Sequence, residues 1–246
     1  MNYTLHLADS ALILSQRNSE WCGHGPVLEQ DIAITNISLD LLGQARYYYQ
    51  YAANLINQSA ETGGPATEDS LAYLRTEREF KNLLMVEQPN GDWAQTILRQ
   101  YFFSQYQYLL LEQLQNNKDE QLAAIAAKSV KETTYHLRWS SEWVIRLGDG
   151  TEESNTRMNK ALTAIWPYTG EMFLPAAYET EAGADVAALK DLWLQKVNAV
   201  LDEATLTIPA KTFMHTGGKN GVHTEQLGFI LTDLQYLQRA YPGAEW

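Results

Sequence analysis

Apolar residues along this chain recur at intervals of three and four positions, and no stretch alternates as a strand does. The pattern predicts helices over residues 5–16, 27–56, 67–86, 93–116, 119–148, 154–165, 185–204 and 224–239. The helix over residues 27–56 would extend for about eight turns, roughly 45 Å. We therefore expect an all-α protein.

Turn and cap signals separate these helices. Pro26 is well placed to open the second helix, Thr67 and Asp92 are expected N-caps, and residues 61–65 and 205–222 read as loops. Because short connections force successive helices to pack side by side, the helices over 27–56, 67–86, 93–116 and 119–148 should form an antiparallel four-helix bundle, with the others as flanking helices. No linker-like segment divides the chain, so we expect a single domain over residues 1–246.

Composition narrows the partners that the chain can have. Eighteen basic against thirty acidic residues give a net charge of −12, which disfavours nucleic acid and membrane surfaces. No window approaches the roughly 18 uninterrupted apolar residues of a membrane span, and no leader pattern opens the chain, so we expect a cytoplasmic protein. With Cys22 as the one cysteine, a metal would need His and carboxylate ligands.

Some four-helix bundles hold two irons between a Glu on each of two helices and a Glu-x-x-His pair on each of the other two. His136 follows Glu132 by four positions instead of three, and Ser104 carries no charge. We therefore expect no complete di-iron site, and a hydrogen-bonded Glu132–His136 pair in the core. The positions that correspond to the template are Asp40, Glu77, Ser104, Glu132, Tyr135 and His136.

Two further features suggest binding. The loop at Gly217, Gly218 and Lys219 precedes the last helix and could hold an anion by its backbone amides, although it lacks the phosphate-loop spacing, and a plain turn is the alternative. Aromatic runs over residues 47–51 and 101–108 would circle their helices. Some of these rings should therefore meet another protein, and we expect Tyr48 or Tyr101 at such an interface.

Five segments carry a family resemblance: EWCGH at 20–24, LDLLGQAR at 39–46, VEQPNG at 86–91, KETTYHLR at 131–138 and TGGKNGVHTE at 216–225. Together they resemble the structural-subunit family, the C component, of phenylacetyl-CoA epoxidases. The resemblance implies a ferritin-like subunit of a bacterial multicomponent oxygenase that epoxidises the ring of phenylacetyl-CoA in aerobic phenylacetate degradation.

In that family the homologous catalytic A component holds the di-iron centre and binds the CoA thioester, and the C component pairs with it in a hetero-oligomer. A separate flavin and iron–sulfur reductase component supplies electrons from NADPH. The resemblance thus implies an oxygenase subunit without catalytic residues, metal or cofactor of its own, in which the six template positions are a vestigial metal site.

Two alternatives stay open. The chain could be a self-sufficient di-iron oxygenase that uses Glu77, Glu132 and His136 with nonstandard ligands, in which case it would bind iron and turn over alone. It could also be a helical module that binds an acyl-CoA, with Lys219 and the glycine loop at the phosphates.

Overall fold

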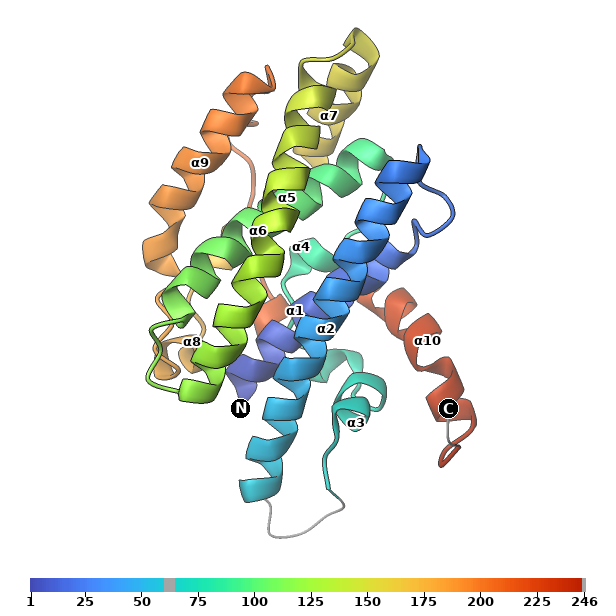
Figure 1. The fold of residues 1–246 in the computed structure, drawn as a ribbon, viewed down its shortest axis with the longest axis vertical. Helices are drawn as coiled ribbons and strands as arrows, with labels where there is room; N and C mark the ends of the chain where they lie inside the picture. Colours follow the sequence, from blue (N-terminus) through green and yellow to red (C-terminus); the bar gives the residue numbers. More distant parts are fainter. Residues whose placement is uncertain (60–64, 245–246) are drawn as a thin grey trace. The chain divides into compact units, whose positions relative to one another are not determined.

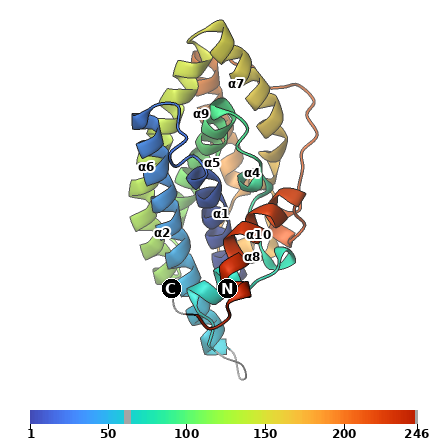
Figure 2. The ribbon, with the colours of Figure 1, turned by 90° about the vertical axis from the view of Figure 1, so that its right-hand side faces the viewer.

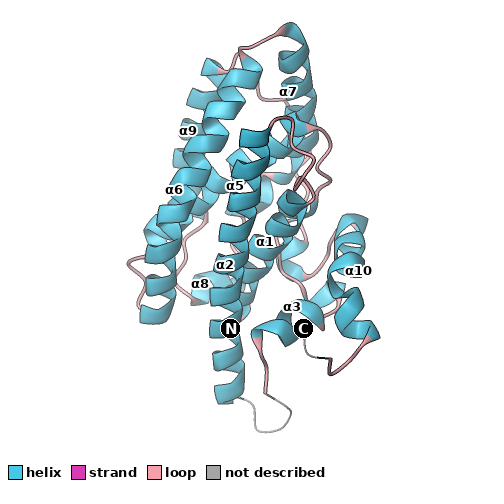
Figure 3. Ribbon diagram, turned by 45° about the vertical axis from the view of Figure 1, so that its right-hand side comes forward, coloured by secondary structure: helices cyan, strands magenta, loops and turns pink. Residues whose placement is uncertain are grey.

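The computed structural model describes residues 1–59 and 65–244, and across these residues the chain forms helices and no strands (Figure 3). The all-α prediction is confirmed. The chain divides into two compact units, Met1–Pro89 with Gly217–Trp246, and Asn90–Thr216. This division does not test the prediction of a single domain. In the described part of the chain, none of the helices has the length and apolar character needed to cross a membrane.

The first unit is built on two long helices, α1 and α2, which pack along each other in antiparallel directions (Figure 1). The predicted helices over residues 5–16, 27–56 and 224–239 are confirmed, with shifted ends. Residues 61–64 of the predicted loop lie outside the described residues. The elements of this unit are α1 (Asn2–Ser19), α2 (Leu28–Ser59), α3 (Glu68–Tyr73), the 3₁₀ turn η1 (Glu77–Glu79), α4 (Leu84–Glu87), the 3₁₀ turn η5 (Gly218–Asn220) and α10 (Glu225–Ala240). The last of these, α10, packs against α3, α4 and η1 (Figure 2).

The predicted helix over residues 67–86 is wrong. Helix α3 starts at the expected cap, where Thr67 Oγ1 accepts a hydrogen bond from the Ser70 amide at 3.1 Å, but it ends at Tyr73. Asp9 of α1 redirects the chain beyond it, since its carboxylate binds the Arg75 guanidinium and accepts from the Lys81 amide at 2.8 Å. This amide therefore bonds to a side chain instead of a helical carbonyl. The segment supplies no long helix, and α1, which we expected as a flanking helix, is the neighbour of α2.

The second unit is built on the antiparallel pair α5 and α6. The expected cap of α5 is present, because Asp92 accepts from the Gln95 amide at 3.1 Å. Asp119 caps α6 in the same way and accepts from the Leu122 amide at 3.0 Å. Each unit thus contains one antiparallel pair of long helices, the element from which ferritin-like bundles are built. The elements are α5 (Trp93–Leu114), α6 (Glu120–Gly148), α7 (Glu152–Ile165), η2 (Trp166–Tyr168), η3 (Gly170–Phe173), α8 (Ala177–Glu181), η4 (Ala187–Leu189) and α9 (Lys190–Glu203).

An aromatic cluster forms the core of the second unit. The Trp193 ring of α9 lies 5.6 Å from the Phe102 ring of α5, centroid to centroid, and 5.9 Å from the Trp166 ring. The indole N–H of Trp193 donates to the Phe102 carbonyl at 3.2 Å, which satisfies its polar edge. Helices α6, α7 and α9 all pack against α5, so most of its side chains are buried, including polar ones.

Candidate functional site

The residues expected at a metal site on α5 and α6 lie in different environments. Ser104 is fully buried, and its Oγ accepts a hydrogen bond from Gln100 Nε2 at 2.8 Å. His136 is also fully buried, whereas Glu132 is half-buried and Tyr135 is exposed. The hydrogen bond expected between Glu132 and His136 stays a prediction.

Thr133, not Glu132, is the buried residue one turn before His136. Its hydroxyl donates to Gln107 Oε1 of α5 at 3.2 Å. Thr133 therefore takes the buried position in the core that we expected for Glu132. The physical reason is desolvation, because a hydroxyl is satisfied by one amide oxygen in the core while a carboxylate is costly to bury without a cation.

The other two template positions belong to the first unit. Asp40 is half-buried on α2. Glu77 is exposed in the η1 turn, so its predicted position on a helix over residues 67–86 is wrong. The error follows from the broken helix, because η1 replaces the helical turn on which that prediction depended.

The donor groups do not fit a di-iron centre. Iron in a ferritin-like bundle needs anionic oxygens and imidazoles converging from several helices. Besides the His136 imidazole, the buried groups Ser104, Gln107 and Thr133 of α5 and α6 are hydroxyls and an amide, and Thr133 bonds to Gln107 across the two helices. Over residues 1–59 and 65–244, no three His, Cys, Asp or Glu side chains are grouped as a metal ion would require. This arrangement holds two helices together.

Sequence reasoning missed a buried cluster around Glu87 of α4. Its carboxylate is fully buried and accepts from the Thr224 amide at 2.7 Å, from Thr224 Oγ1 at 2.8 Å and from Asn82 Nδ2 at 2.8 Å. His223 Nδ1 donates to its second oxygen at 2.8 Å. Four donors satisfy the carboxylate without solvent, so the cluster fastens the start of α10 to α4. The signal was present in the resemblance, because Glu87 and His223 lie in two of the five segments.

A second buried cluster surrounds Asp9. Besides Arg75 and the Lys81 amide, the Tyr49 hydroxyl donates to Asp9 at 2.6 Å. Burial raises the pKa of Tyr49 well above its usual value, and the Asp9 charge raises it further. The Arg75 guanidinium also lies 4.3 Å from the centroid of the Phe80 ring. With solvent excluded, the cluster has a structural role, which is to hold the non-helical segment after α3.

The glycine loop is folded onto the first unit. The amides of Asn220 and Val222 donate to the Gly217 carbonyl at 2.8 and 3.0 Å, and the Gly221 amide donates to the Gly218 carbonyl at 3.0 Å. Lys219 is buried, and a Cβ at Gly218 would lie 2.2 Å from the Asn82 carbonyl oxygen. Three amides of the loop are thus already used within it. An anion site at Gly217, Gly218 and Lys219 stays a prediction.

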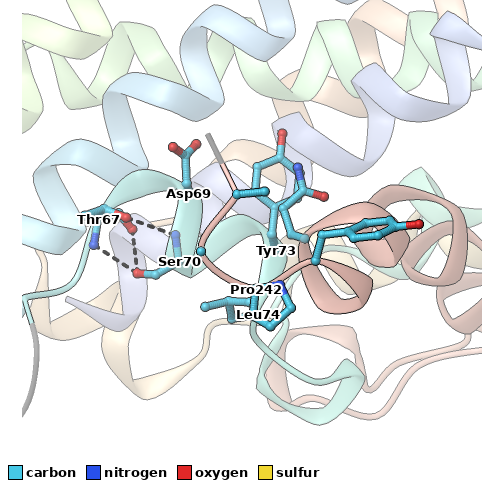
Figure 4. A pocket seen from close by; sticks show the side chains of 10 residues that line it. Thr67, Asp69, Ser70, Tyr73, Leu74 and Pro242 are labelled. Carbon is cyan, nitrogen blue, oxygen red and sulfur yellow. Dashed lines mark hydrogen bonds between the residues drawn. The ribbon is translucent and has the colours of Figure 1, made fainter. Parts of the chain in front are cut away.

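A cavity of about 620 Å³ lies between α3 and the residues that follow α10 (Figure 4). Thr67 and Ser70 of its lining bond to each other, and Tyr73, Leu74 and Pro242 add apolar surface. The charged side chain in the lining is Asp69. An acidic, partly apolar lining does not favour an anionic thioester of CoA.

The two aromatic residues that we expected at an interface are buried, whereas Tyr47, in the same run as Tyr48, is 36% exposed. Tyr48 is 1% exposed and Tyr101 is 0% exposed, so the prediction that they lie at a contact with another protein is wrong. The sequence pattern shows that rings circle a helix, but it does not show how many other helices cover them. Three α-helices, α6, α7 and α9, pack against α5 and cover Tyr101. The large apolar side chains that α2 exposes are mainly aliphatic, and α10 exposes aromatic ones such as Phe229 and Tyr236. Such exposed patches indicate partner surfaces.

Comparisons with known proteins agree with the resemblance. The family described as phenylacetic acid catabolic protein matches residues 1–246. The chain is 48% identical over 249 residues to the C component of the 1,2-phenylacetyl-CoA epoxidase of Escherichia coli (strain K12), and the match covers 99% of this chain and 98% of that protein. The predicted family is confirmed.

Proposed function

Because the chain belongs to the family of phenylacetic acid catabolic proteins, we propose that it is the non-catalytic structural subunit of a multicomponent phenylacetyl-CoA epoxidase. It pairs with a di-iron catalytic subunit and stabilises it during aerobic phenylacetate degradation in the cytoplasm. The similarity to the C component of that enzyme, which extends over nearly the whole chain, supports this role.

One structural observation supports the non-catalytic role independently of the family match. At the fully buried positions of α5 and α6 where a di-iron bundle would place carboxylates, this chain carries hydroxyl and amide groups beside the His136 imidazole, and Thr133 donates to Gln107 across the two helices. Neutral pairs of this kind stabilise a helix contact and do not compensate the charge of iron. The role that fits these groups is to keep a helical scaffold in one conformation for a partner.

The proposal assigns no catalytic residue, metal or cofactor to this chain. The catalytic partner would hold the iron and the CoA thioester. A reductase component would deliver electrons to that partner, within one hetero-oligomer. The net charge of −12 supports a protein partner over nucleic acid or an anionic membrane.

The test is reconstitution. The catalytic subunit alone, this chain alone and both together are supplied with reductase, NADPH, oxygen and phenylacetyl-CoA, and epoxide formation is followed by mass spectrometry. We expect turnover with the catalytic subunit, increased and longer-lived when this chain is present, and none with this chain alone. Turnover by this chain alone would contradict the proposal and favour the self-sufficient oxygenase.

A calorimetric titration of CoA into the isolated chain addresses the remaining alternative. A saturable heat signal that Lys219→Ala weakens would favour the acyl-CoA binding module. The proposal predicts no such signal.

A further inference from the structure

The outer face of α2 is apolar. Leu28, Ile32, Leu39 and Leu42 fall at positions i, i+4, i+11 and i+14, so they share one stripe along the helix. Their exposed fractions are 71%, 51%, 60% and 42%. Thr35 lies between Ile32 and Leu39 on the same stripe. The outer face of a surface helix is normally charged or polar, and exposed aliphatic residues aligned on it indicate contact with another molecule.

Gly43 gives a second, independent observation on the same stripe. It follows Leu39 by four positions and lies inside a 32-residue helix, where glycine is less favourable than alanine. A Cβ built at Gly43 would have no heavy atom within 4 Å among the neighbouring described residues. At Gly148 of α6, in contrast, a Cβ would lie 2.2 Å from the Ala204 carbonyl oxygen. The packing of this chain therefore explains Gly148 but not Gly43.

Glycine within a helix permits a close approach of another backbone. A helix from outside that crossed α2 at Gly43 would account both for the missing side chain and for the aliphatic residues on either side of it. The spacing of three and four positions along the stripe is the one that takes up the side chains of a packed helix.

The charges beside the stripe favour a different protein over a second copy of this chain. Glu29 and Asp40 each follow a stripe residue by one position and so lie about 100° round the helix, at the edge of the face. Arg46 continues the stripe one turn after Leu42, and its guanidinium lies 3.5 Å from the Glu68 carboxylate. Two copies of this chain would each carry −12, and this net charge opposes their association. A partner helix with basic residues beside its apolar stripe fits this edge.

We propose that Leu28, Ile32, Leu39, Leu42 and Gly43 of α2 form the docking face for an apolar, basic-edged helix of the catalytic subunit, which crosses α2 at Gly43. This inference rests on the proposed function, because it takes its partner from it.

The test measures the affinity of the full-length chain for the purified catalytic subunit by biolayer interferometry. Leu39→Asp places a charge in the stripe, and Gly43→Met fills the crossing point with a residue that favours helix. Phe229→Asp is the matched control, since Phe229 is an apolar residue of α10 with 60% exposure. Circular dichroism checks that every variant is folded.

We expect the dissociation constant to rise about tenfold or more for both α2 variants and to stay unchanged for Phe229→Asp. Wild-type affinity in both α2 variants would overturn the docking face and leave the proposed function intact. No binding by the wild-type chain would overturn both. Light scattering of the chain alone tests whether the same face binds a second copy of this chain. If the chain is a dimer that Gly43→Met dissociates, and its affinity for the catalytic subunit is unchanged, the face serves self-association and the proposal is overturned.

Discussion

The buried pair of Asp9 and Arg75 should be strongly coupled, and a double-mutant cycle measures this directly. Asp9 is fully buried and Arg75 is 9% exposed. Asp9→Leu removes the one carboxylate that the Arg75 guanidinium contacts in this cluster, while its other bonds go to the Leu71 and Glu79 carbonyls and the Tyr49 hydroxyl. A buried guanidinium then keeps its charge without a compensating anion.

The expected magnitudes follow from this geometry. Breaking a buried ion pair by removing one partner costs about 3–5 kcal/mol of unfolding free energy. Arg75→Met should cost somewhat less, because the Tyr49 hydroxyl and the Lys81 amide still donate to Asp9. Replacing both partners by apolar residues is often close to neutral. The double variant should therefore be more stable than the sum of the single effects, by a coupling energy of about 2 kcal/mol or more.

Urea unfolding followed by circular dichroism gives the free energies, and hydrogen exchange gives a local readout. In the wild type the Lys81 amide should be protected, because it donates to Asp9, and Asp9→Leu should expose it. Additive free energies within about 0.5 kcal/mol, with unchanged protection of Lys81, would refute the view that this pair holds the segment after α3.

Three further outcomes are expected. Glu87→Gln replaces one acceptor oxygen by an NH2 group, which faces the donors of Thr224 in one amide orientation and those of Asn82 and His223 in the other. It should therefore cost about 1–3 kcal/mol of unfolding free energy and raise hydrogen exchange at the start of α10. Burial, with added effects of Glu179, Tyr178 and Glu171, raises the pKa of Tyr106 well above its usual value, and its hydroxyl has no hydrogen-bond partner among the described residues. As the pH rises, Tyr106 loses its hydroxyl proton in the unfolded chain before it does so in the folded protein. Its contribution to the free energy of unfolding is therefore fully present below about pH 10 and is lost as the pH rises above that value. Tyr106→Phe should flatten that alkaline loss in urea titrations without lowering stability at neutral pH. Gly148→Ala should lower the melting temperature, because the added methyl group would collide with Ala204. Gly43→Ala should raise the melting temperature, because the added methyl group has open space and alanine stabilises a helix interior by about 1 kcal/mol relative to glycine.

The long helices could be predicted from the sequence because their apolar spacing is local. Asp92 was correctly identified as a cap for the same reason, since a cap bonds to an amide three positions away. The region after Thr67 has a helical pattern as well, yet Asp9 binds the amide of Lys81, 72 positions away in the chain. A contact of that kind overrides local propensity and leaves no local signal.

The candidate surface shows the same limit. The pattern marks Tyr101 and its neighbours as apolar, but only the packing of α6, α7 and α9 around α5 decides that these rings are buried. The Glu87–His223 pair joins residues 136 positions apart, so it could be found from sequence only as two segments of one family resemblance. Gly43 needed the structure too, because its meaning depends on open space beside it.

Iron content per chain is the measurement that tests the structural-subunit role most directly. The chain is purified alone, loaded anaerobically with ferrous iron, freed of excess and measured by elemental analysis. With Ser104, Gln107 and Thr133 buried between α5 and α6, we predict essentially no iron. About two irons per chain, the content of a complete bundle site, would contradict the account.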